Sequence, residues 1–485
     1  MIFPICGLTF LWGLLSGTAA QTIPDVLVAK AVPPNTQAIL NLGPDVLKEA
    51  FSQVLKDRNA VKTLEDLPLL SAMENAESQG FFGSLVSSIL KQIVWMKVTN
   101  ADILPLQLEK SEDGQGLTMK IPLELVAGIK TPLSWKVIEL HIVLDVVAEV
   151  RMGPDGAGRS RLLPGPCAAG RGSLSVRLLD KISFMVSLFA DKVIDTLLPA
   201  FPQLVKKQLC PVISEALNDL SAKLLSSVKV PVPVGSSDLE FEVLSSTIVD
   251  KGVQITLGAL LTDGKGLVNR MSNPSGGTLP IPQMGQSTIN MVVGEDVVNG
   301  VLGVTLPPET YSVRINSVLP DLGQRLKSEL IKTNPETAKS LTQSEILKVT
   351  TQEAPVISLK DGSANVAQLN LIELFTNSQA VRPLFTLGVE SSSEGRFFTD
   401  EDKIKLNLKG IKSDRIHLIK SNIGLFKTDP LKNLVDEILT TVLLPTQNGK
   451  IGSGIPTEPV KRLGYEKLKI FPVDGALLVT PASLT

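Results

Sequence analysis

The chain is poor in the residue types that most enzymes use for chemistry. It has two histidines and three cysteines among 485 residues. His141 and His417 each stand in an alternating, strand-like pattern without a cluster of carboxylates or cysteines beside them. The motifs G-x-S-x-G, H-E-x-x-H and C-x-x-C do not occur. We therefore expect no catalytic residues, no metal site and no cofactor, and the sequence favours a protein that is not an enzyme.

Aromatic residues and an excess of charge of one sign are also missing. Aromatic residues make up 4% of the chain, and 47 Lys and Arg residues face 49 Asp and Glu residues. Binding of nucleic acid usually needs a basic surface and aromatic side chains that stack on bases, so we do not expect it. The hydrophobic residues, 43% of the chain, are mostly aliphatic. This composition fits either a generous core or an apolar cavity that holds acyl chains.

Long hydrophobic runs are absent except at the start of the chain. Residues 1–20, MIFPICGLTFLWGLLSGTAA, hold an apolar run of about eleven residues followed by the small residues Thr18 and Ala20. This pattern predicts a secretory signal peptide, although it contains no Lys or Arg. No later segment reaches the roughly 18 uninterrupted apolar residues of a membrane span. We expect a secreted, extracellular protein without a transmembrane segment.

The cysteines support the same compartment. Removal of residues 1–20 would take Cys6 away and leave Cys167 and Cys210. An even pair in an oxidising compartment predicts a disulfide bond. Two separate buried cysteines are the alternative.

Hydrophobic periodicity predicts an α+β arrangement in the N-terminal half. The segment 43–59 has apolar residues at helical spacing, with charged residues opposite them. The segments 117–125 and 138–152 alternate between apolar and polar residues, as half-buried antiparallel strands do. A second, long helix is expected over 183–228. The other expected features are a helical stretch at 82–93, a strand at 170–179 and bends in the long helix near Pro199, Pro202 and Pro211.

The second half of the chain repeats features of the first. GPDVLKEAF at Gly43 resembles GEDVVNGVL at Gly294, an offset of 251 residues. VIDTLLP, which finishes at Pro199, resembles LTTVLLP, which finishes at Pro445, an offset of 246 residues. Two matches in the same order and at nearly one offset predict a duplicated unit. Each copy should open with an amphipathic helix, continue with antiparallel strands and end with a second apolar helix.

A proline-rich stretch lies between the two copies. KVPVPVGSS, residues 229–237, has the density of proline and glycine that is typical of a semi-rigid, extended linker. We therefore expect an N-terminal domain over 21–228, a linker over 229–245 and a C-terminal domain over 246–485.

One loop-like segment is locally basic. Five arginines and a single acid, Asp155, lie between Arg151 and Arg177. The planar guanidinium group suits phosphate, so Arg159, Arg161 and Arg171 are candidates for binding a phosphorylated headgroup. A loop that only keeps the protein soluble is the alternative.

Several strings distributed from end to end resemble one known family. They are GPDVLKE (43–49), PLLSAM (68–73), VAGIKTPL (126–133), KKQLCPVI (206–213), RPLFTLGVE (382–390), LLPTQNGKIGSGIP (443–456) and LVTPASL (478–484). Together with the duplication and the cysteine pair, they resemble the family of bactericidal/permeability-increasing protein (BPI), lipopolysaccharide-binding protein and the plasma lipid-transfer proteins. Within that family the resemblance is to the long airway, or palate-lung-nasal epithelium, branch.

The resemblance implies a two-domain boomerang, in which each domain is a twisted antiparallel sheet wrapped around long helices and a central sheet joins the two. It also implies that the cysteine pair ties a strand to the long helix of the N-terminal domain. Each domain would hold phospholipid acyl chains in an apolar pocket. The residues that we expect to line the N-terminal pocket lie on apolar helix faces: Val46, Phe51, Val186, Phe189, Val193 and Leu197.

The function implied by the resemblance is binding of phospholipid or bacterial lipopolysaccharide in mucosal innate immunity, with bound phospholipid or lipid A as ligand and peripheral contact with lipid surfaces. One departure is that residues 21–235 contain 22 basic and 22 acidic residues, whereas bacteria-killing members are strongly basic there. Three alternatives remain open: a lipid-transfer protein, a surface-active structural protein of mucosal secretions, and an enzyme whose site escapes motif reading.

Overall fold

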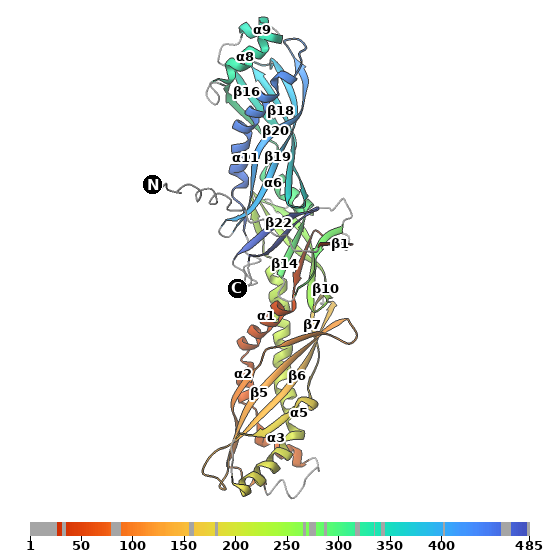
Figure 1. The fold of residues 1–485 in the computed structure, drawn as a ribbon, viewed down its shortest axis with the longest axis vertical. Coiled ribbons are helices and arrows are strands. Elements are labelled where there is room, and N and C mark those ends of the chain that lie inside the picture. Colours follow the sequence, from red (N-terminus) through yellow and green to blue (C-terminus); the bar gives the residue numbers. More distant parts are fainter. Residues whose placement is uncertain are drawn as a thin grey trace, which may run out of the picture.

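The protein is an elongated rod in which two domains lie end to end and share a sheet in the middle (Figure 1). It is represented by a computed structural model. The residues that the structure describes are 27–31, 35–78, 89–154, 160–179, 183–264, 268–270, 278–285, 289–315, 321–333, 335–340, 345–400, 403–456 and 467–482. The predicted fold class, two α+β domains joined through a central sheet, is confirmed.

The N-terminal domain contains a six-stranded antiparallel sheet. Its strands are β3 (Trp95–Ile103), β5 (Gly116–Lys130), β6 (Ile138–Pro154) and β7 (Ser160–Ala169) in this order, with β4 (Gln107–Lys110) beside β5 and β8 (Ser175–Leu178) beside β6. The strands predicted at 117–125 and 138–152 are confirmed, because every second residue of β5, and of β6 as far as Val150, is apolar and buried. The strand predicted at 170–179 is shorter than expected, because a 3₁₀ turn (Arg171–Ser173) precedes β8.

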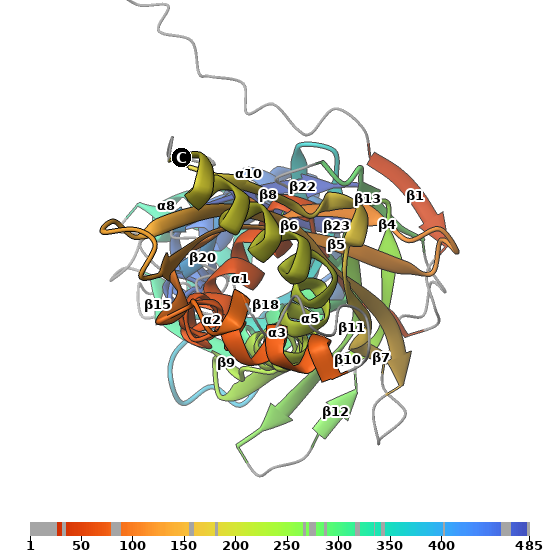
Figure 2. The same cartoon turned by 90° about the horizontal axis from the view of Figure 1, so that it is seen from below.

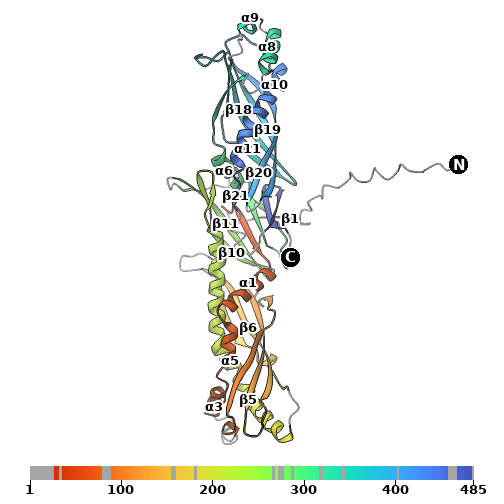
Figure 3. The ribbon, with the colours of Figure 1, turned by 90° about the vertical axis from the view of Figure 1, so that its left-hand side faces the viewer.

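Helices cover the concave side of this sheet. They are α1 (Pro44–Asp57), α2 (Ala60–Glu65), α3 (Leu69–Ser78) and the 45-residue α5 (Phe184–Val228). Figure 2, which looks along the rod, shows β5, β6 and β7 curving past these helices. The helices predicted at 43–59 and 183–228 are confirmed, and α5 changes direction along its length (Figure 3). The helical stretch predicted at 82–93 lies mostly outside the described residues.

The C-terminal domain repeats this plan with a seven-stranded sheet. Its strands are β15 (Thr310–Arg314), β16 (Ile346–Thr351), β18 (Ser363–Phe375), β19 (Phe385–Asp400), β20 (Lys403–Ser421) and β21 (Ile455–Pro456) in this order, with β17 (Val356–Lys360) beside β18. Its helical segments are α6 (Glu295–Thr305), α8 (Leu322–Thr333), α9 (Pro335–Ser340), a 3₁₀ turn (Asp429–Leu431), α10 (Lys432–Ile438), a π-helical turn (Leu439–Leu443) and α11 (Leu444–Ile451). Both Leu-Leu-Pro strings lie within helical stretches and do not end them, since Pro199 is inside α5 and Pro445 is in the first turn of α11.

The central sheet is built from both halves of the chain. Its order is β22 (Leu468–Val473), β23 (Ala476–Pro481), β14 (Ile289–Gly294), β2 (Ala38–Leu42), β11 (Gly252–Asp263), β10 (Ser237–Val249) and β9 (Val232–Val234), with β12 (Val268–Arg270) beside β11. A separate pair is formed by β1 (Leu27–Ala31) and β13 (Thr278–Pro282). Every described pairing is antiparallel, including that of β2 with β14.

The duplication predicted from the sequence is visible at the centre of this sheet. Leu40 of β2 faces Met291 of β14, and Met291 follows Leu40 by 251 positions. This is the offset between Gly43 and Gly294, which precede α1 and α6. These two equivalent residues therefore face each other, and an approximate twofold axis passes through the Leu40–Met291 pair.

The stretch predicted as a linker differs from the expectation. It is extended, but residues 232–234 and 237–245 are paired in the central sheet as β9 and the first part of β10. Val232 and Val234 are buried, whereas Pro233 between them is exposed. Proline is tolerated at this place because β9 lies at the edge of the sheet, where one side of the strand needs no partner.

Candidate functional site

A cavity of about 150 Å³ lies where the central sheet meets the C-terminal domain. Its walls come from the end of α5, from strands of the central sheet, from α6, from β19 and β20, and from the segment around β21. The lining residues are Leu40, Ser227, Val228, Val232, Val234, Gly235, Leu239, Phe241, Met291, Val293, Val297, Val298, Val301, Leu302, Thr305, Phe397, Ile404, Leu406, Ile451, Ser453, Gly454, Ile455, Leu477 and Val479.

The lining is apolar because several elements turn their apolar positions toward one point. On α6, Val297, Val298, Val301 and Leu302 recur at helical spacing and are buried. The strands contribute alternate residues, such as Leu239 and Phe241 of β10 and Leu477 and Val479 of β23. Among the described residues that line the cavity, none has a charged side chain. Such a wall can hold hydrocarbon.

The cavity reaches the surface between two turns. Gly235 and Ser453 are exposed at its rim, and Phe397, Ile404 and Ile455 are half-buried there. Gly454 has φ +68°, and a Cβ atom in its place would lie 3.0 Å from the carbonyl oxygen of Ile404. Glycine is therefore needed at this point of the rim for both conformation and space.

Helix α6 is held firmly beside the cavity. Asn299 donates through Nδ2 to the carbonyl oxygen of Ile357 at 3.0 Å and accepts from the N–H of Ile357 at 2.7 Å. Glu295 accepts from the N–H of Leu359 at 2.6 Å, so α6 is fixed to β17. Asp296 accepts from Nε2 of Gln37 at 3.1 Å, and burial raises the pKa of this carboxyl.

The six residues proposed from the sequence for an N-terminal pocket lie together in the core of the N-terminal domain. Five of them are buried and Val46 is half-buried, and all belong to one apolar cluster around α5. None of the six lines the cavity described above. Their role in holding an acyl chain stays a prediction.

The three arginines proposed for a headgroup are only partly described. Arg161 on β7 is exposed, whereas Arg159 and the side chain of Arg171 lie outside the described part of the chain. Nearby, Arg151 is bound by an acid, with Nη2 at 2.9 Å from Oε2 of Glu149. Binding of a headgroup by these three arginines therefore stays a prediction.

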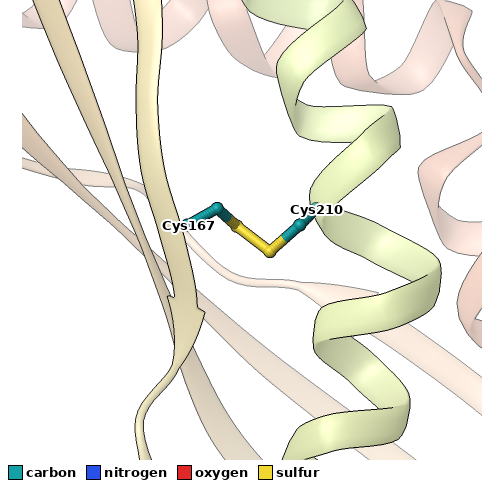
Figure 4. The surroundings of a disulfide bond; sticks show 2 residues. All are labelled: Cys167 and Cys210. Atoms are coloured by element: carbon teal, nitrogen blue, oxygen red, sulfur yellow. A yellow bond between two sulfur atoms is a disulfide. The ribbon is translucent and has the colours of Figure 1, made fainter.

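Cys167 and Cys210 form a disulfide bond (Figure 4). Cys167 lies on β7 and Cys210 near the middle of α5, with a distance of 5.9 Å between their Cα atoms. The bond ties the edge of the N-terminal sheet to the long helix, as the family resemblance implies.

The histidines belong to ordinary cross-strand pairs. Nε2 of His141 lies 2.5 Å from Oε1 of Glu124, and Nε2 of His417 lies 3.7 Å from Oε1 of Glu390. Among the described residues, no group of three or more His, Cys, Asp or Glu side chains is arranged to hold a metal ion. In the same part of the chain, no helix combines the length and the hydropathy needed to cross a membrane.

Comparison with known families matches both halves of the chain. The model of the LBP / BPI / CETP family, N-terminal domain, matches residues 54–220, and that of the C-terminal domain matches residues 258–481. The chain belongs to the LBP/BPI/CETP family. Human BPI fold-containing family B member 1 is 43% identical over 478 residues, covering 98% of this chain and 97% of that protein. The mouse protein of the same name is 37% identical, with 98% of each chain covered.

A solved structure of this family has the same fold. The crystal structure of lipopolysaccharide binding protein superposes with a TM-score of 0.52 and covers 93% of this chain and 99% of that one, at 14% identity. The shared fold therefore survives extensive change of sequence, and the family resemblance inferred from short strings is confirmed.

Sequence reasoning missed the cavity because its walls come from distant parts of the chain. Leu40, Ser227 and Leu477 meet there only after the central sheet has formed. One signal was present in the sequence: residues 297–304 of the second repeat, VVNGVLGV, contain no charge, whereas the matching helix at 43–59 carries several. A helix that lacks a charged face is expected to be covered on more than one side.

Proposed function

We propose that this protein binds lipid by taking acyl chain into the cavity beside α6. The observation that supports the proposal is the cavity itself, whose wall is apolar and which opens at Gly235 and Ser453. Each methylene group that leaves water for such a wall contributes about 0.8 kcal/mol. An apolar cavity of about this size holds a molecule as small as benzene, so a longer chain requires the lining to open toward the rim.

The lipids that we propose are phospholipid and bacterial lipopolysaccharide, and the setting is mucosal innate immunity, where a secreted protein would modulate responses to endotoxin. Membership of the LBP/BPI/CETP family supports this proposal, as does the relative named lipopolysaccharide binding protein, which shares the fold. The same cavity would serve a lipid-transfer protein, and exchange of labelled lipid between two vesicle populations distinguishes transfer from binding.

The test is a variant that fills the cavity. Val301 lines the wall on α6. The larger side chain in Val301→Trp should displace at least two methylene groups of a bound acyl chain from the cavity, which weakens lipid uptake about ten-fold. Val381→Trp is the matched control, because Val381 is 91% exposed and lies outside the lining. Lipid is extracted from the purified proteins and counted by mass spectrometry before and after loading with phospholipid. Equal uptake by both variants and the unaltered protein would remove the cavity as the binding site.

A second function, adhesion to lipid surfaces, is favoured by the far end of the N-terminal domain. The turn between β5 and β6 carries Trp135, which is fully exposed, and α5 starts at the same end with Phe184 (77% exposed) and Met185 (72% exposed). Lys136 of the same turn is exposed, as are Lys91 and Lys97 near the start of β3, which pairs with the end of β5. Exposed aromatic and apolar side chains with lysine residues in the same region suit an anionic lipid interface.

This second function is tested by sedimentation with vesicles. Trp135→Ser with Phe184→Ser should reduce binding to anionic phospholipid vesicles and leave lipid uptake into the cavity unchanged. The control replaces Leu425, which is 95% exposed in the C-terminal domain, by serine. If the double variant and the control bind vesicles equally, this end of the protein is not the contact surface.

A further inference from the structure

The core of the C-terminal domain is divided by a layer of buried polar residues. The inner faces of β18 and β19 carry Gln368, Asn370, Ser391 and Ser393, each at most 7% exposed. On one side of this layer lies an apolar cluster that includes Ile372 and Leu387, and on the other side lies a separate one that includes Val366 and Leu408.

Hydrogen bonds join this layer to the helix that covers the sheet. Gln447 of α11, 1% exposed, donates through Nε2 to Oε1 of Gln368 at 2.8 Å. Asn370 donates through Nδ2 to Oγ of Ser391 at 2.9 Å. The Gln368–Gln447 pair therefore crosses the interior of the domain from sheet to helix. Half-buried Leu444 packs against both apolar clusters beside the pair.

The polar layer reverses the usual pattern of a strand. On β18, Gln368 and Asn370 point inward, whereas Leu369 between them is 41% exposed. The inner faces of β5 and β6 in the N-terminal domain show no such reversal, and their core is a single apolar cluster. Polar groups that replace apolar ones inside only one of two repeats point to a function of that repeat.

The apolar cluster that includes Val366 and Leu408, which we call the near cluster, is continuous with the cavity. Val298, Leu302, Leu406, Ile451 and Leu477 belong both to this cluster and to the wall of the cavity. Along β19, the inward positions from the cavity to the layer are Phe397, Gly395, Ser393 and Ser391. A chain that entered at the rim and moved deeper would pass the near cluster and then meet the polar layer.

We propose that this layer is the floor of the lipid site, and that the Gln368–Gln447 pair determines the longest acyl chain that the C-terminal domain accepts. This inference rests on the proposed binding of lipid in the cavity. To pass the layer, a chain must separate the two amides and leave them without partners. That cost is comparable to the gain from burying a few methylene groups, so the chain ends on the near side.

The layer also contains two buried polar atoms whose hydrogen bonds are not formed within the described part of the chain. Oγ of Ser393 and Oδ1 of Asn370 are buried and have no hydrogen-bond partner among the residues that the structure describes. Ser393 lies on the side of the cavity, and Asn370 lies on the far side of the glutamine pair along the strands. A methylene chain offers neither atom a donor, so hydrocarbon gains little by approaching them.

The test replaces both members of the pair, because removing both partners leaves no amide unpaired. Gln368→Leu with Gln447→Leu makes the two apolar clusters continuous. The lipid-free proteins are offered an equimolar mixture of saturated fatty acids of graded length, and the bound acids are extracted and counted. The expected result is a shift of the preference toward longer chains by about ten-fold in the double variant.

The matched control is Gln53→Leu with Gln107→Leu, the same two changes at exposed positions in the other domain. It should keep the length profile of the unaltered protein. A double variant that is folded, by its circular dichroism and unfolding transition, but keeps the unaltered profile overturns the inference. Uptake by Val301→Trp that equals uptake by the unaltered protein, or no uptake by the unaltered protein, overturns the proposed function itself.

A second measurement needs no variant in the layer. A fatty acid brominated at its terminal carbon is bound to the unaltered protein, and the bromine is located by anomalous diffraction. We expect it among the residues of the near cluster, such as Val366 and Leu408. A bromine beside Ile372 and Leu387, beyond the layer, would overturn the inference.

Discussion

Loss of the disulfide bond should destabilise the N-terminal domain selectively. Cys167 and Cys210 are 43 residues apart, and both lie within this domain. In the chain-entropy model, closing a loop of 43 residues contributes about 4 kcal/mol to the free energy of unfolding. For a domain of about 200 residues, this corresponds to a fall in Tm of about 8 to 16 °C.

The assay is differential scanning calorimetry of Cys167→Ala with Cys210→Ala. The transition of the N-terminal domain should move down and that of the C-terminal domain should stay, because the crosslink contacts only β7 and α5. The unaltered protein in reductant is the control, since it keeps both sulfur atoms and loses only the bond. A shift below about 2 °C would refute the reasoning, because it corresponds to at most about 1 kcal/mol. So would equal shifts of both transitions.

Two further predictions concern the middle of the rod. Burial raises the pKa of Asp296 above its ordinary value of 3.8, so the folded protein holds this proton more tightly than the unfolded chain does. The contribution of this carboxyl to stability is then greatest below the unfolded pKa and falls as the pH rises through the folded pKa. Between acid and neutral pH, the free energy of unfolding of the unaltered protein should therefore fall by a contribution that Asp296→Asn lacks. Urea titrations of both proteins over this pH range measure the difference. Parallel pH profiles of the two proteins would contradict the prediction. Asn41 donates to Oδ1 of Asn290 at 2.8 Å and accepts from Nε2 of Gln254 at 2.9 Å. Asn41→Ala leaves both amides unpaired and should cost about 2 to 4 kcal/mol in the same titrations, whereas a loss below about 0.5 kcal/mol would show that water replaces the partner.

The sequence was most informative where one periodicity runs without interruption. Helix α1 and strands β5 and β6 were predicted because their apolar residues recur at a constant spacing, which depends on local geometry alone. The disulfide followed from the number of cysteines. The duplicated unit was predicted from two string matches at nearly equal offsets. The pairing of Leu40 with Met291 shows one of them, 251 residues.

The cavity and the polar layer could not be predicted in this way. The cavity depends on which strands become neighbours in the central sheet, and the sequence does not state that β2 lies between β11 and β14. The layer was hidden because Leu369 and Leu371 suggest that the opposite face of β18 points inward. The linker was misjudged for a related reason: alternating valine and proline fits both an unpaired segment and an edge strand.

The position of β2 also has a consequence for the order in which the molecule is completed. Residues 38–42 are synthesised long before their partners, which are residues 253–257 of β11 and 289–293 of β14. Residues 476–479 of β23 are needed to cover the other edge of β14. Contacts between such distant segments form slowly, because a long loop must close first. The middle of the rod, and with it the wall of the cavity, is therefore finished only after residues 476–479 have been synthesised.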